Sequence, residues 1–370
     1  MVQRDIAVVS VPRVSYQERH SLLMRTEPTR VKVAFPQGAY LRDYERTYAA
    51  IVSDELKQYA NETAFALEDN PARADIIILI QSAQYKTVEY VRLLENDPLV
   101  RNHAERVYVI DYDDHPEGML AGLYTSIERG FLDPAIHRIW PILFMNNPLL
   151  YDLDPSAIWG NSPTRLFSFV GAASHDVRNQ LFNLFSGESP LYHVERVNKW
   201  YNYNDDEHRQ FVKIALDSVF CLCPRGYASY TNRIPEVMAM GRVPVIIADD
   251  WVPFSFGEDR PYYIRVAERD MAHLPDILAN HRKESEGYRR NARALWEQHC
   301  SRNRRVVAAV ECVASLAARA GAGVSFEEYR QRWHSREFLV KCGWTFRQRL
   351  SLRLSQHARR LFGKPQLNTP

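Results

Sequence analysis

Two charged side chains three residues apart, Arg233 and Glu236, stand out as a candidate binding pair in this 370-residue chain. They fall near the start of a predicted helix over about 232–240, so both project from one helix face. Arg233 would neutralise a diphosphate, and Glu236 would accept hydrogen bonds from two ribose hydroxyl groups. The alternative is an ordinary ion pair on a solvated helix face, worth about 0.2–0.5 kcal/mol. Spacing alone leaves the two interpretations evenly balanced.

The elements around this pair would place it beside a ligand. A predicted buried strand, Val219–Cys223, is stopped by Pro224, and Gly226 allows a tight turn before the helix. Gly241 ends the helix, and the next predicted strand is Val243–Ala248. A strand, a glycine turn and a helix in this order present free backbone N–H groups to an anion.

The first half of the chain alternates between strand-like and helix-like segments. The apolar runs that predict strands are Ile6–Val11, Val31–Phe35, Asp75–Ile80 and Arg106–Asp111, and the helical pattern is Tyr40–Ala60. Such alternation favours parallel strands joined by helical crossovers. A turn-rich segment at 159–164 precedes a new strand, Leu166–Val170, that ends in Gly171. We therefore predict two α/β domains, 1–162 and 163–345, with ligands at the carboxyl ends of the strands.

Residues 218–254 resemble the exostosin-type glycosyltransferases of family 47. That family carries a pattern close to P-x-G, then R-x-x-E-A, then G-C-x-P-V. The matching residues here are Pro224, Gly226, Arg233, Glu236, Gly241, Pro244 and Val245. The chain departs at Val237, usually Ala, and at Arg242, usually Cys, which weakens the subfamily assignment. The likeness extends more loosely over about 166–278.

The resemblance implies a GT-B architecture, in which two Rossmann-like domains face a central cleft. The first domain would bind a glycan acceptor, the second a nucleotide-sugar donor, and the transfer would invert the anomeric centre. The positions that it assigns to the donor are Gly171, Arg178, Arg225, Gly226, Asn232, Arg233 and Glu236. For Arg178 the alternative is a surface helix arginine beside Asp176.

An inverting transfer needs a base that takes the proton of the acceptor hydroxyl group. The candidates are Asp113, Asp114 and His115, because they follow the predicted strand Arg106–Asp111 at its carboxyl end. The same stretch contains an Asp-x-Asp pattern, which binds metal and nucleotide in another class of glycosyltransferase. A polar strand-to-loop turn with a capping aspartate is an equally good interpretation.

A second group of polar residues ends the strand Val243–Ala248. Asp249 and Asp250 are the second candidate pair for the base, but their place near the donor favours binding of sugar hydroxyl groups. Trp251 is predicted to stack on an acceptor sugar. An aromatic residue at a strand end is more often part of the core. We predict no metal and no resident cofactor, since arginines and backbone N–H groups would stabilise the departing diphosphate. The UDP-sugar is a co-substrate in this prediction.

Composition narrows the function classes further. Hydrophobic residues make up 46% and charged residues 25%, which excludes a disordered chain, a collagen-like repeat and a coiled coil. No apolar run reaches the roughly 20 residues needed to cross a bilayer. The first residues lack the pattern of a secretory signal, so we expect a cytoplasmic protein. The cysteines are scattered and predict buried free thiols.

The charge of +2 hides an uneven distribution. Residues 330–364 hold ten basic residues and one acidic residue, so this segment carries +9 and the rest of the chain −7. Within the third predicted segment, 346–370, an apolar stripe over 346–362 resembles a basic amphipathic helix that contacts a membrane surface. The alternative is a terminal helix packed on the protein itself. Nucleic-acid binding is not expected, because the body is acidic and carries no recognition motif.

The sequence therefore predicts an inverting glycosyltransferase. It would move a sugar from a UDP-sugar to a glycan or lipid-linked glycan in bacterial surface polysaccharide synthesis, in the cytoplasm or at the inner face of the membrane. One alternative is a GT-B transferase with another donor, such as a GDP-sugar. The other is a non-catalytic protein that binds nucleotide sugars or glycans.

Overall fold

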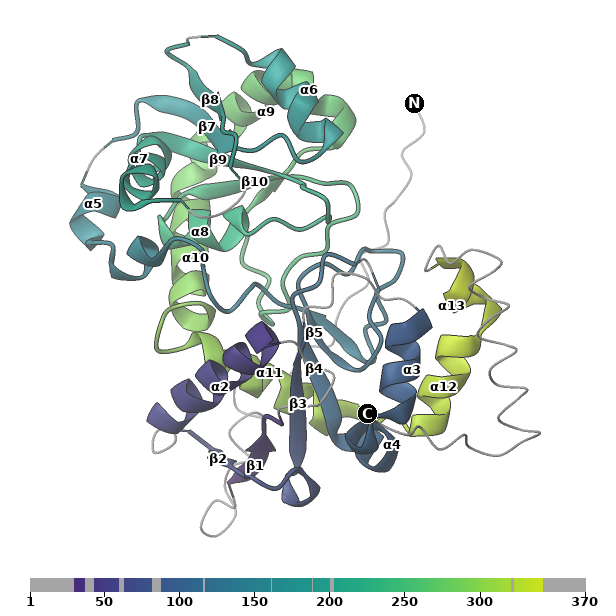
Figure 1. Ribbon diagram of the computed structural model, residues 1–370. Helices are drawn as coiled ribbons and strands as arrows, with labels where there is room; N and C mark the ends of the chain where they lie inside the picture. The colour runs from purple at the N-terminus through teal and green to yellow at the C-terminus, as the bar shows by residue number, and fades with distance from the viewer. Residues whose placement is uncertain are drawn as a thin grey trace.

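The computed structural model contains two α/β units, each built on one parallel sheet (Figure 1). The predicted strand Ile6–Val11 and the tail 346–362 lie outside the described residues. The described ranges are 30–36, 43–59, 63–81, 88–115, 117–160, 162–187, 189–199, 203–320 and 323–341.

In the described part of the chain, the first sheet has six parallel strands in the order β2-β1-β3-β4-β5-β6. Their bounds are β1 (Val31–Ala34), β2 (Phe65–Leu67), β3 (Ile76–Gln81), β4 (Val107–Asp111), β5 (Gly122–Tyr124) and β6 (His137–Ile139). Every residue of β3 and β4 is buried, as expected for parallel strands covered on both faces. The predicted strands at 31–35, 75–80 and 106–111 are confirmed. The three-residue strands β2, β5 and β6 are too short to leave a hydrophobic pattern.

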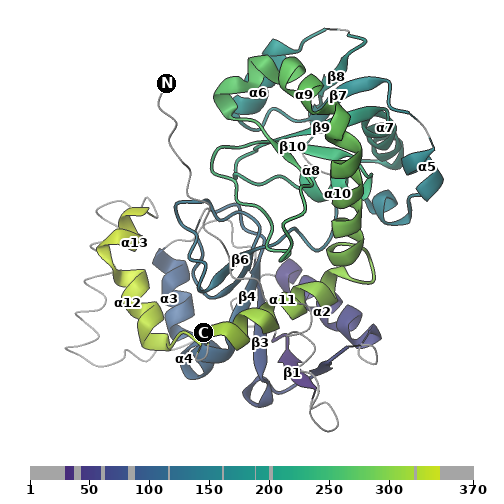
Figure 2. The same cartoon turned by 180° about the vertical axis from the view of Figure 1, so that it is seen from behind.

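Helices from both ends of the chain cover this first sheet. They are α2 (Asp43–Gln58), α3 (Val88–Asn96), α4 (Pro98–His103), α11 (Arg305–Ala320), α12 (Phe326–His334) and α13 (Arg336–Lys341). Helix α11 packs on α2 and β5, and α12 packs on α4 (Figure 2). The buried Trp333 donates its indole N–H to the Met119 carbonyl at 2.8 Å, and the Tyr329 hydroxyl accepts the Ala121 N–H at 2.8 Å. Helices α11 to α13, which the sequence prediction placed in the second domain, therefore belong to the first unit, with α13 packed on α12.

The second sheet has five parallel strands in the described residues, in the order β11-β10-β9-β7-β8. Its strands are β7 (Arg165–Gly171), β8 (Tyr192–Arg196), β9 (Ser218–Pro224), β10 (Val243–Ile247) and β11 (Ile264–Arg265). Its helices are α5 (Pro155–Trp159), α6 (Asp176–Leu184), α7 (Asp205–Leu216), α8 (Arg233–Ala239), α9 (Leu274–His281) and α10 (Ser285–His299). Short 3₁₀ turns occur along the whole described chain: η2 (Pro71–Arg73), η3 (Ala104–Arg106), η4 (Pro148–Asp152), η5 (Glu268–His273) and η6 (Arg282–Glu284). The predicted strand–turn–helix–strand unit is confirmed as β9, α8 and β10.

In both sheets, the second strand along the chain lies on one side of the first strand and the third strand lies on the other side. In the second sheet the chain passes from β7 to β8 on one side and then to β9 on the other. The first sheet repeats this with β1, β2 and β3. Ligands of open parallel sheets bind outside the carboxyl ends of the strands at such a reversal. In the second sheet this point lies between the ends of β7 and β9.

The two units are joined through packed residues and backbone hydrogen bonds. One hydrophobic cluster runs from the first sheet into α8 and on to Trp251. The Ser255 N–H donates to the Ile139 carbonyl at 2.8 Å, and the Arg129 N–H donates to the Asp250 carbonyl at 3.1 Å. The chain returns to the first unit where α10 gives way to α11 (Figure 2). The predicted fold class, an α/β protein of two Rossmann-like units as in GT-B, is confirmed by the two parallel sheets.

None of the described helices is long and apolar enough to cross a membrane. Among the cysteines of the described residues, Cys221, Cys223 and Cys300 are buried free thiols and Cys312 is a half-buried one. The prediction of free thiols thus holds for these four.

Candidate functional site

The pair Arg233 and Glu236 begins helix α8, directly after the loop that follows β9. Arg233 Nη1 donates to Glu236 Oε2 at 2.8 Å, and its Nη2 donates to the Val170 carbonyl at 2.9 Å. The guanidinium carbon lies 3.9 Å from the ring centroid of Phe211. The side chains are only 19% and 7% exposed, so this is not an ion pair on a solvated helix face.

Burial changes the acid–base behaviour of this pair. Loss of hydration raises the pKa of Glu236 above its ordinary value, and the positive charge of Arg233 acts in the opposite direction. A buried carboxylate is costly unless its oxygens are paired. Glu236 is thus a carboxylate that gains from further hydrogen-bond donors, such as hydroxyl groups of a ligand.

Arg178, on the first turn of α6, lies across the reversal point between β7 and β9. Its Nε donates to the Arg225 carbonyl at 3.0 Å, its Nη1 to the Ala172 carbonyl at 3.2 Å and its Nη2 to the Pro224 carbonyl at 3.2 Å. A longer contact of 3.4 Å reaches the Thr231 hydroxyl. The predicted alternative, a surface helix arginine beside Asp176, does not describe these contacts.

The positively charged guanidinium group of Arg178 is hydrogen-bonded to neutral groups. Each hydrogen bond that it makes to a described residue goes to an uncharged oxygen. Burial lowers the pKa of its guanidinium to about 10, and the positive charge of Arg233 adds to that effect. The side chain therefore stays cationic at neutral pH, and a ligand phosphate would compensate a charge that the carbonyl dipoles only partly balance.

Two of the predicted donor-site residues are glycines, and their surroundings differ. A Cβ on Gly226 would lie 3.3 Å from Ser174 Oγ and 3.4 Å from Arg178 Nη2, so the backbone there covers the arginine closely. A Cβ on Gly171 would lie 2.7 Å from the ring of Phe169. The absence of a side chain at Gly171 is thus explained by packing, and its contact with a donor stays a prediction.

The other predicted donor residues lie in the same loop. Asn232 precedes α8, is partly exposed and makes no capping hydrogen bond through its side chain. Arg225 Nη2 lies 3.3 Å from the Tyr227 carbonyl and 3.5 Å from Glu128 Oε1. The latter contact links this loop to the first unit.

The predicted sugar-binding residues that follow β10 differ in their exposure to solvent. Asp249 and Asp250 are exposed. Asp249 exchanges two hydrogen bonds of 3.1 Å with Glu268, which join the strand end to η5. Trp251, predicted to stack on an acceptor sugar, is only 2% exposed and packs against Tyr263 with ring centroids 4.9 Å apart. That prediction is wrong, because the chain turns inward after Asp250 and puts the ring in the shared core.

The predicted base candidates follow β4, as expected, but differ in exposure. Asp113 is 3% exposed, and its N–H donates to the Asp111 carboxylate at 2.8 Å. Asp114 is exposed, although crowding by protein atoms raises its pKa. His115 Nδ1 lies 3.9 Å from Glu117 Oε2. Base catalysis by any of the three stays a prediction.

Several residues around the cations were missed by the sequence analysis. They are Glu128, Ser174, Phe211 and Thr231. Phe211 has the pattern of an ordinary apolar helix position, and Glu128 follows a strand too short to recognise. Ser174 and Thr231 lie in turns whose hydroxyl groups carry no distinguishing pattern. Their signal is spatial, because each touches a residue far away in the sequence.

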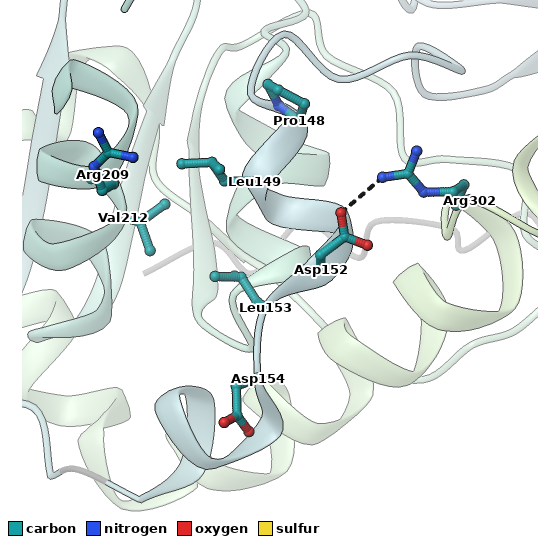
Figure 3. Close-up of a pocket in the computed structure, with 8 residues that line it drawn as sticks. All are labelled: Pro148, Leu149, Asp152, Leu153, Asp154, Arg209, Val212 and Arg302. Atoms are coloured by element: carbon teal, nitrogen blue, oxygen red, sulfur yellow. Dashed lines mark hydrogen bonds and ion pairs between the residues drawn. The ribbon is translucent and has the colours of Figure 1, made fainter. Parts of the chain in front are cut away.

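Two pockets lie apart from these residues. One of about 400 Å³ is bounded by η4, α7 and Arg302, which pairs with Asp152 at 2.9 Å (Figure 3). The other, of about 520 Å³, shares Asp152 and Arg302 with it. Neither is lined by a predicted site residue. Within the described ranges, no group of three or more His, Cys, Asp or Glu side chains could hold a metal ion.

The class of the protein follows from this domain. Residues 146–281, which include every predicted donor residue, match the family model described as the Exostosin GT47 domain. This part of the chain is thus similar to a glycosyltransferase family 47 domain of the exostosin type, in agreement with the sequence resemblance.

The relatives fit the same class. An Exostosin-1 homolog from Caenorhabditis elegans is 27% identical, over 72% of this chain and 82% of that protein. A probable glucuronoxylan glucuronosyltransferase from Arabidopsis thaliana is 41% identical, but over 22% of this chain and 21% of that protein. Among solved structures, a glycosyltransferase from Rickettsia africae is similar with a TM-score of 0.41 at 9% identity, covering 78% of this chain and 99% of that one.

Proposed function

We propose that the protein is an inverting glycosyltransferase that takes a sugar from a UDP-sugar and transfers it to a hydroxyl group of a glycan. The observation that carries this proposal is the convergence of Arg178, Arg233 and Glu236 at the strand-order reversal of the second sheet. Two cations and one carboxylate match the charges and hydroxyl groups of a nucleoside diphosphate.

In this proposal each residue has one task. Arg178 and Arg233 contact the diphosphate, whose negative charge grows as the bond to the sugar breaks. Their guanidinium groups are already held by backbone carbonyls, so little reorganisation is needed when that charge develops. Glu236 accepts hydrogen bonds from the ribose. We propose that these groups balance the leaving group without a divalent ion.

The acceptor would bind on the side of the first unit, where the carboxyl ends of β4 and β5 supply polar side chains. We place the transfer in bacterial surface polysaccharide synthesis, with a glycan or a lipid-linked glycan as acceptor. A location in the cytoplasm or at the inner face of the membrane belongs to the same proposal. The basic segment 346–362, whose charge favours anionic lipid, supports it.

The test of the donor site is Arg233→Ala, with UDP affinity measured by isothermal titration calorimetry. A hydrogen bond to a charged group contributes about 1.5–3 kcal/mol, so the affinity should fall at least about tenfold. Arg209→Ala is the matched control, because Arg209 lies on α7 and pairs only with the exposed Asp206 among described residues. Equal UDP affinity of the Arg233 variant and the wild type would contradict the assignment. A melting curve checks that each variant folds.

Two further measurements separate the alternatives. A thermal-shift panel of UDP, GDP, CDP and TDP should favour UDP, and a preference for GDP would move the protein to a GDP-sugar donor. A protein that binds UDP-sugars but transfers nothing to any glycan acceptor would be a binding protein.

A further inference from the structure

We infer that Glu128 is the general base of the transfer, an inference that rests on the proposed function. Glu128 lies in the loop after β5, and the Thr125 N–H in that loop donates to the Asp111 carbonyl at the end of β4 at 3.2 Å. The next residue, Arg129, donates its N–H to the Asp250 carbonyl at the end of β10. Glu128 is therefore placed where the carboxyl edges of the two sheets meet.

The carboxylate of Glu128 reaches the loop that holds the donor-site cations. Its Oε1 accepts a hydrogen bond from the Ser229 hydroxyl at 3.2 Å and lies 3.5 Å from Arg225 Nη2. The carbonyl of that same Arg225 accepts the hydrogen bond from Arg178 Nε. One residue thus separates this carboxylate of the first unit from the proposed phosphate site of the second.

The two oxygens of Glu128 are in different situations. Oε1 is held by Ser229 and Arg225, whereas Oε2 makes no hydrogen bond to any described residue, and the side chain is 22% exposed. A base must be fixed in orientation and open to the group that it deprotonates. Asp114 is exposed but has no such anchor to the second unit among described residues, and Asp113 is almost fully buried.

The proposed transfer moves one proton to Glu128 and one sugar to the acceptor. Glu128 Oε2 takes the proton of the acceptor hydroxyl group, and the oxygen forms a bond to the anomeric carbon of the donor. The bond between that carbon and the β-phosphate oxygen breaks, and its electron pair leaves with UDP. Arg178 and Arg233 receive the added charge. Ser229 and Arg225 keep the carboxylate in position throughout.

The first test is Glu128→Gln, which keeps the shape but removes the base. With the UDP-sugar and glycan acceptor that give transfer in the wild type, kcat should fall at least about 100-fold, because general base catalysis contributes about 10²–10⁴. UDP affinity should change less than threefold. The control is Glu105→Gln, an exposed glutamate that precedes β4 at the opposite edge of the same sheet. It should keep wild-type kcat and KM.

A second variant separates base catalysis from positioning. Azide attacks the anomeric carbon without losing a proton, so Glu128→Ala should release UDP with azide as fast as the wild type while transfer to the hydroxyl acceptor stays lost. A higher donor KM with unchanged kcat, or no azide-supported turnover in a folded, UDP-binding variant, would show that Glu128 only positions the loop.

Wild-type kcat in Glu128→Gln together with a large loss in Asp114→Asn would assign the base to Asp114. A wild-type protein that neither binds UDP nor transfers sugar would refute the proposed function instead. The two failures are therefore distinguishable.

Discussion

The two units share a topology but differ in which of their strands are followed by polar residues that could bind a ligand. In the second unit, Arg178 is held by carbonyls at the ends of β7 and β9. Arg233 is held by the Val170 carbonyl of β7 and by Glu236. In the first unit, the loops that follow β1 and β3 at the equivalent reversal fall in 37–42 and 82–87, outside the described residues. The candidate site residues of the first unit that the structure describes follow β4 and β5 instead.

This difference fits the tasks proposed for the two units. The diphosphate is the same in all nucleoside diphosphate sugars, so its site gains from cations fixed before the donor arrives. An acceptor hydroxyl group needs one oriented base, and the best oriented carboxylate, Glu128, is anchored by the opposite unit. The proposed acceptor site thus depends on the second unit for its geometry.

The largest effect should come from Trp251→Ala, which tests whether the second unit contributes an aromatic residue to acceptor binding. Because Trp251 is buried against Tyr263 and Phe254, the free energy of unfolding should fall by about 3–5 kcal/mol. Urea denaturation measures it. Tyr227→Ala, at a tyrosine 68% exposed in the loop after β9, should change stability by less than about 0.5 kcal/mol. A fully stable Trp251 variant with a raised acceptor KM would restore the stacking hypothesis.

A smaller loss is expected for Arg178→Met, which tests the prepared donor site directly. The variant leaves the carbonyls of Ala172, Pro224 and Arg225 without this donor, at about 1 kcal/mol each, so the free energy of unfolding should fall by about 3 kcal/mol. UDP affinity should fall about tenfold or more. Arg209→Met serves as the exposed control. If stability drops while UDP affinity is retained, Arg178 supports the loop and does not contact the donor.

The smallest expected effect is a pH dependence of UDP affinity, which distinguishes the buried Glu236 from the exposed carboxylates. Burial raises the pKa of Glu236, so the group protonates at a higher pH than an ordinary glutamate. Ribose hydroxyl groups donate to the ionised form, and UDP affinity should therefore decrease as the pH falls through that raised pKa, by at most tenfold per pH unit. Glu236→Gln should bind UDP more weakly with this dependence removed. A variant that keeps the wild-type pH profile would exclude Glu236 as its source.

The same raised pKa has the opposite sign for stability. The unfolded chain ionises Glu236 at a lower pH than the folded one does, so the contribution of this group to the stability of the UDP-free protein is present at low pH. It is lost as the pH rises through the folded-state pKa. Binding of UDP and folding thus respond to this one carboxyl group in opposite directions.

The sequence predicted the elements around Arg233 and Glu236 well for a local reason. Strand β9, the turn at Gly226, helix α8 and strand β10 are consecutive, so each boundary residue acts on its neighbours. Gly241 illustrates this, since it ends α8 with a φ of +57° that favours glycine. The prediction that Arg233 and Glu236 share a face required only helical spacing.

The tertiary structure decided the features that residue spacing along the chain does not determine. That Arg178 spans the ends of β7 and β9, that Trp251 is buried, and that α11 to α13 return to the first sheet all depend on contacts between distant segments. Glu128 is the clearest case, because its partners Arg225 and Ser229 lie about a hundred positions away in the chain. Local patterns determine elements and their faces, whereas only packing of two sheets against each other brings two loops into contact.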